Sequence, residues 1–130
     1  IAFGIKEEKI NYKRIKQLLK IVLLEDFIEN TKMGLQTVVG ERGIILSGGQ
    51  RQRIGIARAL YKENIQTLIL DEATSALDNQ TEAKLIENIN SMSKDYTLIM
   101  IAHRLTTLKN CNKIFEIKNG FIREISLDSI

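Results

Sequence analysis

Residues 46–53 read Leu-Ser-Gly-Gly-Gln-Arg-Gln-Arg, a stretch that combines a helix start with adjacent glycines. Ser47 and Gln50 have the S-x-x-Q spacing of a capping box, so a helix is expected to begin directly after Ser47. Gly48 and Gly49 would let backbone approach a ligand closely, and the helix start supplies unpaired N–H groups and a positive dipole end. The stretch predicts an anion-binding turn, whereas a plain helix cap is the structural alternative.

A pair of carboxylates follows a short apolar run later in the chain. Residues 67–70 are typical of a buried strand, and Asp71 and Glu72 come directly after them. Open α/β sheets bind their ligands at the carboxyl ends of parallel strands. Mg²⁺ keeps most of its waters and is held by carboxylate and phosphate oxygens, which suits such a pair. An isolated acidic pair is more often a solvated turn, and spacing alone assigns no role to either residue.

Asp78 and His103 also stand where strands and helices are expected to begin or end. Asp78 can cap a helix over residues 79–92, and Ser75 before it suits a turn. His103 is the only histidine and follows an apolar run over residues 96–102. A lone histidine is more often a structural group than a catalytic one.

The hydrophobic pattern predicts the elements that hold these residues. Three-and-four spacing favours an amphipathic helix over residues 9–24, and a short helix is expected over 26–30. Residues 34–43 should form a loop. The helix over 79–92 is expected to place Ala83, Ile86 and Ile89 on one face, and the strand over 96–102 should be buried on both faces of a parallel sheet. Asn119-Gly120 predicts a terminal hairpin.

Composition limits the class of protein. The 130 residues are 44% hydrophobic, enough for one core and too few for two ordinary domains. The net charge of +3 is interspersed rather than clustered, so a nucleic-acid partner is not expected. Cys111 is the only cysteine, which excludes a disulfide within the chain and indicates a reducing compartment. No apolar run approaches the roughly eighteen residues of a membrane span.

These motifs, in this order and spacing, resemble the ATP-binding domain of the ABC transporter family. Residues 46–50 are similar to the signature motif, 68–72 to the Walker B strand and 75–78 to the D-loop, and His103 is similar to the switch histidine. Residues 37–43 resemble the stretch that precedes the signature in exporters. Val38 stands where that stretch usually has Glu, which places one polar contact to the transmembrane partner in doubt.

The resemblance implies an α/β fold, namely part of a P-loop NTPase-like ABC ATPase domain with a helical subdomain and the C-terminal half of the parallel-sheet core. Residues 1–46 would be mostly helical subdomain and pre-signature loop, and residues 47–130 would carry the signature helix, Walker B strand, D-loop, switch histidine and hairpin. The sequence contains no G-x-x-x-x-G-K-[ST] phosphate loop. We therefore expect a C-terminal fragment that is inactive by itself.

The resemblance also implies site roles, with ATP and Mg²⁺ as cofactors. Asp71 would hold Mg²⁺, Glu72 would orient the attacking water, and His103 would sense the γ-phosphate. The expected cofactor-binding residues are Ser47, Gly48, Gly49, Gln50 and Asp78. The first four would serve ATP held by a second domain in a head-to-tail dimer, and Asp78 lies in the loop that would cross the dimer interface to the opposite phosphate loop.

The function implied is ATP hydrolysis coupled to export, at the cytoplasmic face of a membrane and through a transmembrane partner domain. The leaning is toward lipids, saccharide-lipids or other amphiphiles as substrates. The alternative is a DNA-repair or chromosome-associated ATPase with the same motifs. Such proteins insert a long coiled coil before the signature, whereas this chain has only a compact helical stretch there.

Overall fold

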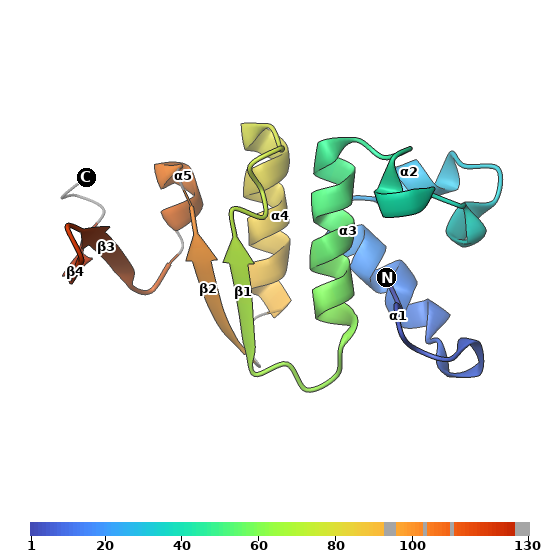
Figure 1. The fold of residues 1–130 in the computed structure, drawn as a ribbon, viewed down its shortest axis with the longest axis horizontal. Helices are drawn as coiled ribbons and strands as arrows, with labels where there is room; N and C mark the ends of the chain where they lie inside the picture. Colours follow the sequence, from blue (N-terminus) through green and yellow to red (C-terminus); the bar gives the residue numbers. More distant parts are fainter. Residues whose placement is uncertain (93–95, 103, 110, 127–130) are drawn as a thin grey trace.

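A computed structural model describes residues 1–92, 96–102, 104–109 and 111–126 (Figure 1). Its helices are α1 (Tyr12–Ile21), α2 (Glu25–Glu29), α3 (Gly48–Tyr61), α4 (Asn79–Met92) and α5 (Leu105–Leu108), and short 3₁₀ turns cover Glu7–Lys9, Gly34–Gln36 and Glu41–Gly43. Its strands are β1 (Thr67–Asp71), β2 (Thr97–Ile101), β3 (Ile114–Lys118) and β4 (Phe121–Ile125). No helix in these ranges is long and apolar enough to cross a membrane.

Strands β1 and β2 form a parallel pair whose carboxyl ends meet at one edge. Thr67 lies opposite Thr97, and Asp71 lies opposite Ile101. Leu68 and Leu70 point into a core that they share with α1, α3 and α4, and α3 lies between β1 and α1 (Figure 1). The acidic end of β1 is thus held on a packed strand.

The opposite face of this sheet is exposed, so the expectation that β2 is buried on both faces is wrong for the described residues. Ile69, Ile99 and Ile101 are 62%, 47% and 52% exposed. The physical reason is that the described helices cover only one side of the pair, so burial alternates along β1. A continuous apolar run shows that both faces are apolar, and it does not show that the described chain covers both.

Helix α1 is shorter than its apolar pattern predicted. The Asn11 side chain accepts a hydrogen bond from the Arg14 N–H and fixes its start, and Leu23, with φ 57°, stands just beyond its end. The Arg14 guanidinium then donates to the carbonyls of Leu60 and Lys62, each at 3.0 Å. This contact satisfies carbonyls at the end of α3, which have no partner inside their helix.

The bounds predicted for α4 are confirmed, but its buried face is shifted. Ile86 and Ile89 are buried as expected, whereas Ala83 is exposed. Glu82 and Leu85 are buried instead. Positions 82, 85, 86 and 89 have the i, i+3, i+4, i+7 spacing of one helix face, so a carboxylate occupies the first position of an otherwise apolar stripe.

The terminal hairpin is confirmed. Strands β3 and β4 pair antiparallel around Asn119 and Gly120, which have φ values of 52° and 80°. Two adjacent positive φ angles are what a two-residue hairpin turn requires, and Asn-Gly adopts them at low cost. The hairpin lies at the opposite end of the molecule from α2 (Figure 1).

Candidate functional site

The turn at residues 47–50, called here the capped turn, begins α3 as predicted. The Gln50 N–H donates to Ser47 Oγ at 3.1 Å, and the Ser47 N–H donates to Gln50 Oε1 at 2.9 Å. These reciprocal bonds complete the capping box. Because Ser47 is exposed, the start of α3 is accessible to a ligand from solvent.

Gly49 has a structural reason to be glycine that the sequence did not reveal. A Cβ built there would lie 2.7 Å from Leu77 Cδ2 and 3.2 Å from the Ala76 carbonyl oxygen. Gly49 is buried. Because it has no side chain, the segment between β1 and α4, called here the 72–78 loop, can pack closely against α3. A contact of Gly49 with a ligand remains a prediction.

Asp71 and Glu72 lie at the carboxyl edge of the sheet, and both are exposed. The Glu72 N–H donates to the Ile101 carbonyl at 3.1 Å and extends the register of β1 and β2 by one residue. Glu72 has φ 47°, a left-handed conformation that costs a residue with a Cβ about 1–2 kcal/mol. Backbone strain of this kind gathers at functional sites, which supports a role for Glu72.

Asp71 fits a magnesium ligand by its chemistry and its exposure. Mg²⁺ is usually bound by one or two carboxylates together with phosphate oxygens, and it keeps several waters. The described ranges contain no group of three or more His, Cys, Asp or Glu side chains that could hold a metal. An exposed carboxylate such as Asp71 could hold Mg²⁺ together with phosphate oxygens and water.

Asp78 caps α4, as its position predicted. Its Oδ1 accepts from the Thr81 N–H at 2.9 Å and its Oδ2 accepts from Thr81 Oγ1 at 2.6 Å. These hydrogen bonds, the hydroxyl bond first, hold the pKa of Asp78 below its ordinary value. Asp78 is exposed, so it can also meet a partner, and its predicted cofactor contact remains a prediction.

A buried polar network lies behind the loop. Glu82 Oε1 accepts from Thr74 Oγ1 at 2.6 Å and from Thr107 Oγ1 at 2.9 Å, and Oε2 lies 2.8 Å from Arg104 NH1. Burial alone would raise the pKa of Glu82, but the hydrogen bonds from Thr74, Arg104 and Thr107 and the charge of Arg104 hold it below the ordinary value. Glu82 is therefore a buried, paired carboxylate. His103, next to Arg104 in the chain, lies outside the described residues.

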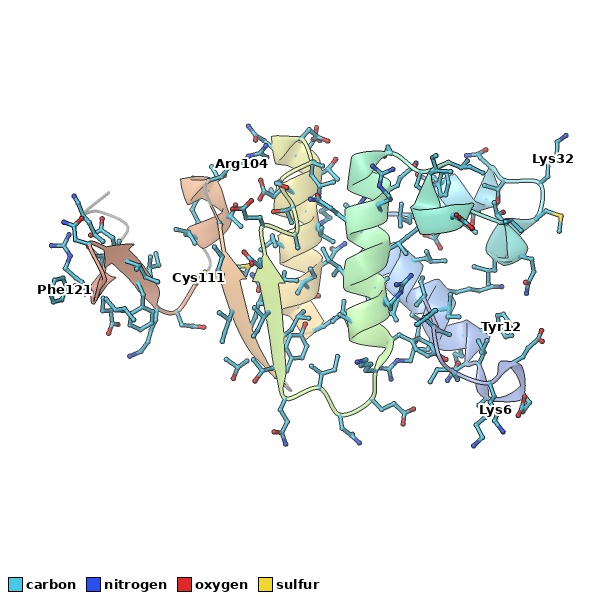
Figure 2. All side chains as sticks on the ribbon, viewed as in Figure 1. Lys6, Tyr12, Lys32, Arg104, Cys111 and Phe121 are labelled. Carbon is cyan, nitrogen blue, oxygen red and sulfur yellow. The ribbon has the colours of Figure 1, made fainter. Side chains whose placement is uncertain are left out.

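The structure brings the capped turn and the acidic strand end together through the 72–78 loop. Gly49 packs against one side of this loop, and the Glu82 network holds Thr74 from another. Figure 2 shows Arg104 beside α5, on the same side of the view as the start of α4, into which the loop leads. Two motifs some twenty residues apart are thus parts of one packed unit.

Three residues of this unit were missed by sequence reasoning, namely Gln52, Glu82 and Arg104. The signal for Glu82 was present, because it occupies the first place of an apolar helix stripe. Gln52, whose amide contacts the 72–78 loop, carried no such signal, since a glutamine on a helix is ordinarily a solvated residue.

A comparison with protein-family models matches residues 6–75, more than half of the chain, to the model described as ABC transporter. The chain belongs to the ABC transporter family. Its fold class, part of an ABC ATPase domain, is confirmed by a bacterial Atm1-family ABC exporter solved with ATP bound. That structure matches with a TM-score of 0.83 and 35% identity over 95% of this chain and 22% of the exporter chain.

Curated relatives of this ABC-family chain are also transport proteins by name. The alpha-hemolysin translocation ATP-binding protein HlyB of Escherichia coli O157:H7 is 56% identical over 76% of this chain and 14% of that protein. The ATP-dependent lipid A-core flippase of Pasteurella multocida (strain Pm70) is 46% identical over 95% of this chain and 21% of that protein. The chain thus spans about a fifth or less of these relatives.

Proposed function

We propose that this chain contributes to ATP binding and hydrolysis in an ABC exporter. The observation that carries the proposal is the packing of the capped turn against the 72–78 loop, where Gly49 leaves no space for a Cβ beside Ala76 and Leu77. This packing sets a potential anion-binding turn and the loop that continues from Asp71 and Glu72 at fixed positions. Fixed donors and carboxylates are what phosphoryl transfer requires of a protein.

Asp71 is proposed to hold Mg²⁺ through a water, and Glu72 to orient or deprotonate the attacking water. The exposure of both carboxylates at the sheet edge and the left-handed backbone of Glu72 support these roles. When bound, Mg²⁺ neutralises charge on the β- and γ-phosphates. Asp71 would then contact the hydrated ion, and Glu72 would contact the attacking water.

The capped turn is proposed to face ATP held by a second ATP-binding domain in a head-to-tail dimer. Ser47 is exposed at the start of a helix whose N-terminal dipole favours an anion. We assign Gly48, Gly49 and Gln50 to the same contact, Asp78 to the dimer interface, and His103 to sensing of the γ-phosphate.

The complete protein is proposed to couple this chemistry to export through a transmembrane domain. Its relatives are named for translocation of alpha-hemolysin and for flipping of the lipid A core, which supports a large amphiphile, a lipid or a saccharide-lipid as the substrate. ATP binding would close two domains at the cytoplasmic face of the membrane, and hydrolysis would reopen them.

Residues 1–130 by themselves are proposed to bind ATP weakly and not to turn it over. Most nucleotide affinity in phosphate-loop proteins comes from a backbone cradle and its lysine, and this sequence contains no such motif. Calorimetric titration of the 130-residue chain should give no tight binding. Micromolar affinity would overturn this part of the proposal.

The proposed function is tested on the complete protein in lipid nanodiscs. We expect ATP hydrolysis that depends on Mg²⁺ and that is lost on chelation and restored by added Mg²⁺. A protein that is folded by its thermal transition but hydrolyses no ATP would overturn the proposal. Hydrolysis stimulated by DNA and not by lipid would instead favour the DNA-repair class.

A further inference from the structure

The side-chain amide of Gln52 joins α3 to the 72–78 loop. Its Oε1 accepts a hydrogen bond from the Ala76 N–H at 3.0 Å, and its Nε2 donates to Ser75 Oγ at 2.9 Å. A longer contact of 3.4 Å joins Nε2 to the Glu72 carbonyl oxygen. The oxygen and the nitrogen of the Gln52 amide therefore both form hydrogen bonds with the 72–78 loop.

Gln52 and Gly49 face this loop together. They are three residues apart on α3, so their side-chain positions lie on the same face of the helix. Gly49 packs against Ala76 and Leu77, while Gln52 binds the preceding part of the loop. The Ser75 N–H also donates to the Glu72 carbonyl at 3.1 Å, so the residues that Gln52 holds form a hydrogen-bonded turn that begins at Glu72.

Helix formation and core packing do not account for this amide. The capping box is completed by Ser47 and Gln50 without Gln52, and the Gln52 side chain is only half-buried. A methionine could occupy the same helix position with a similar length. What the amide adds is a polar link between the start of α3 and the turn at Glu72.

We propose that Gln52 is a positioning residue that couples two half-sites for nucleotide, the one at Asp71 and Glu72 in its own domain and the one that the capped turn offers to the partner domain. The inference rests on the proposed function and deepens it. A displacement of the turn at Glu72 is passed to α3 through the two short hydrogen bonds of Gln52. The occupancy of one nucleotide site thereby changes the geometry of the other, which is the requirement for coupling between sites.

The test uses the complete transporter in nanodiscs and measures ATP hydrolysis against ATP concentration. The variants are Gln52→Met, Ser75→Ala and the two combined. Gln17→Met is the matched control, because it makes the same chemical change at an exposed position of α1. Ser75→Ala removes only a hydroxyl, so it keeps the proposal testable even where Gln52→Met folds poorly.

Gln52→Met should lower kcat by roughly 10- to 100-fold, the effect of misplacing reacting groups. The KM for ATP should stay within about twofold, because the proposed nucleotide contacts are unchanged. The Hill coefficient should fall toward unity, and the thermal midpoint should stay with that of Gln17→Met. Ser75→Ala should give a smaller effect in the same direction, and it should add little in the Gln52→Met background, since the two residues share one interaction.

Unchanged kcat and Hill coefficient in Gln52→Met and Ser75→Ala, with an active parent, would overturn the coupling and leave the proposed function standing. Additive effects of the two variants would overturn it as well, because they would place the residues in separate roles. A parent transporter that hydrolyses no ATP would overturn the proposed function, and the coupling with it.

Discussion

Arg104 NH1 lies 2.8 Å from Glu82 Oε2, and it also donates to the Leu77 carbonyl at 3.0 Å. The two side chains differ in exposure, since that of Arg104 is 38% exposed and that of Glu82 is 6% exposed. Arg104 is thus bound to α4 through Glu82 and to the 72–78 loop through Leu77. Loss of the buried partner should therefore affect stability more than loss of a surface ion pair.

Glu82→Gln should lower the free energy of unfolding by about 1–3 kcal/mol, the usual cost of leaving buried polar partners imperfectly satisfied. The measurement is urea denaturation of the isolated ATP-binding domain. Glu87→Gln is the matched control, because Glu87 pairs with Lys84 at 2.9 Å on the exposed face of α4. It should cost less than about 1 kcal/mol. Equal losses in the two variants would contradict the structural role of Glu82.

The contribution of Glu82 should also depend on pH. Its folded-state pKa is lowered by the hydrogen bonds and the charge that outweigh its desolvation, so its stabilising effect is fully present above the unfolded pKa of about 4.3. The effect should shrink as the pH falls from that value through the lower folded pKa. Denaturation of the parent and of Glu82→Gln across this acidic range should show that the difference between their free energies of unfolding becomes smaller. A difference that grows in acid would contradict the lowered pKa of Glu82.

Gly49→Ala and Gly55→Ala make the same change on one helix and should have opposite effects. A Cβ at Gly49 meets Leu77 at 2.7 Å, whereas one at Gly55 meets nothing within 4 Å. Overpacking costs about 1–3 kcal/mol, more than the gain of about 1 kcal/mol from replacing a helical glycine. Gly49→Ala should therefore lower the thermal midpoint and Gly55→Ala should raise it. A rise in both would show that the loop yields without cost.

Glu72→Gln in the complete transporter should slow hydrolysis on the order of 10²- to 10⁴-fold, because it removes a general base. ATP binding should survive, since the amide keeps the size and most hydrogen bonds. Size-exclusion chromatography of the Glu72→Gln ATP-binding domain with ATP and Mg²⁺ should then show a dimer where the parent shows a monomer. Glu63→Gln, at an exposed carboxylate just beyond α3, is the control. Turnover within a few-fold of the parent would remove Glu72 from this role.

Ser47→Arg should abolish hydrolysis while each domain still binds ATP at its own phosphate loop. The reason is that Ser47 is exposed at the start of α3, where an arginine would place bulk and charge against the partner's nucleotide. Ser47→Thr keeps the capping hydroxyl and should remain active. The measurements are ATPase rate and equilibrium nucleotide binding, and equal loss of both would argue against two half-sites.

The sequence by itself determined the features that depend on a few neighbouring residues. The hairpin at Asn119 and Gly120, the capping box of Ser47 and Gln50 and the Asp78 cap of α4 are all present. Each is a contact within about three residues, so its energy is decided locally whatever the rest of the chain does. The motif order was likewise sufficient to indicate the family.

Only the tertiary structure decided which side chains meet across long stretches of chain. Gly49 is expected from the sequence to be glycine for the sake of a ligand, and the structure adds a second reason, because Leu77 and Ala76 pack against it. The apolar stripe of α4 marks position 82 as a buried one, but only the structure shows that Arg104 and two threonines are the partners of Glu82 there. The exposed side of the β1–β2 sheet could not be predicted either, because apolar residues on a strand mark a face that favours burial without showing what covers it. Leu77 lies more than twenty residues from Gly49 and Arg104 more than twenty from Glu82, and no periodic or local signal shows which residues meet over such distances.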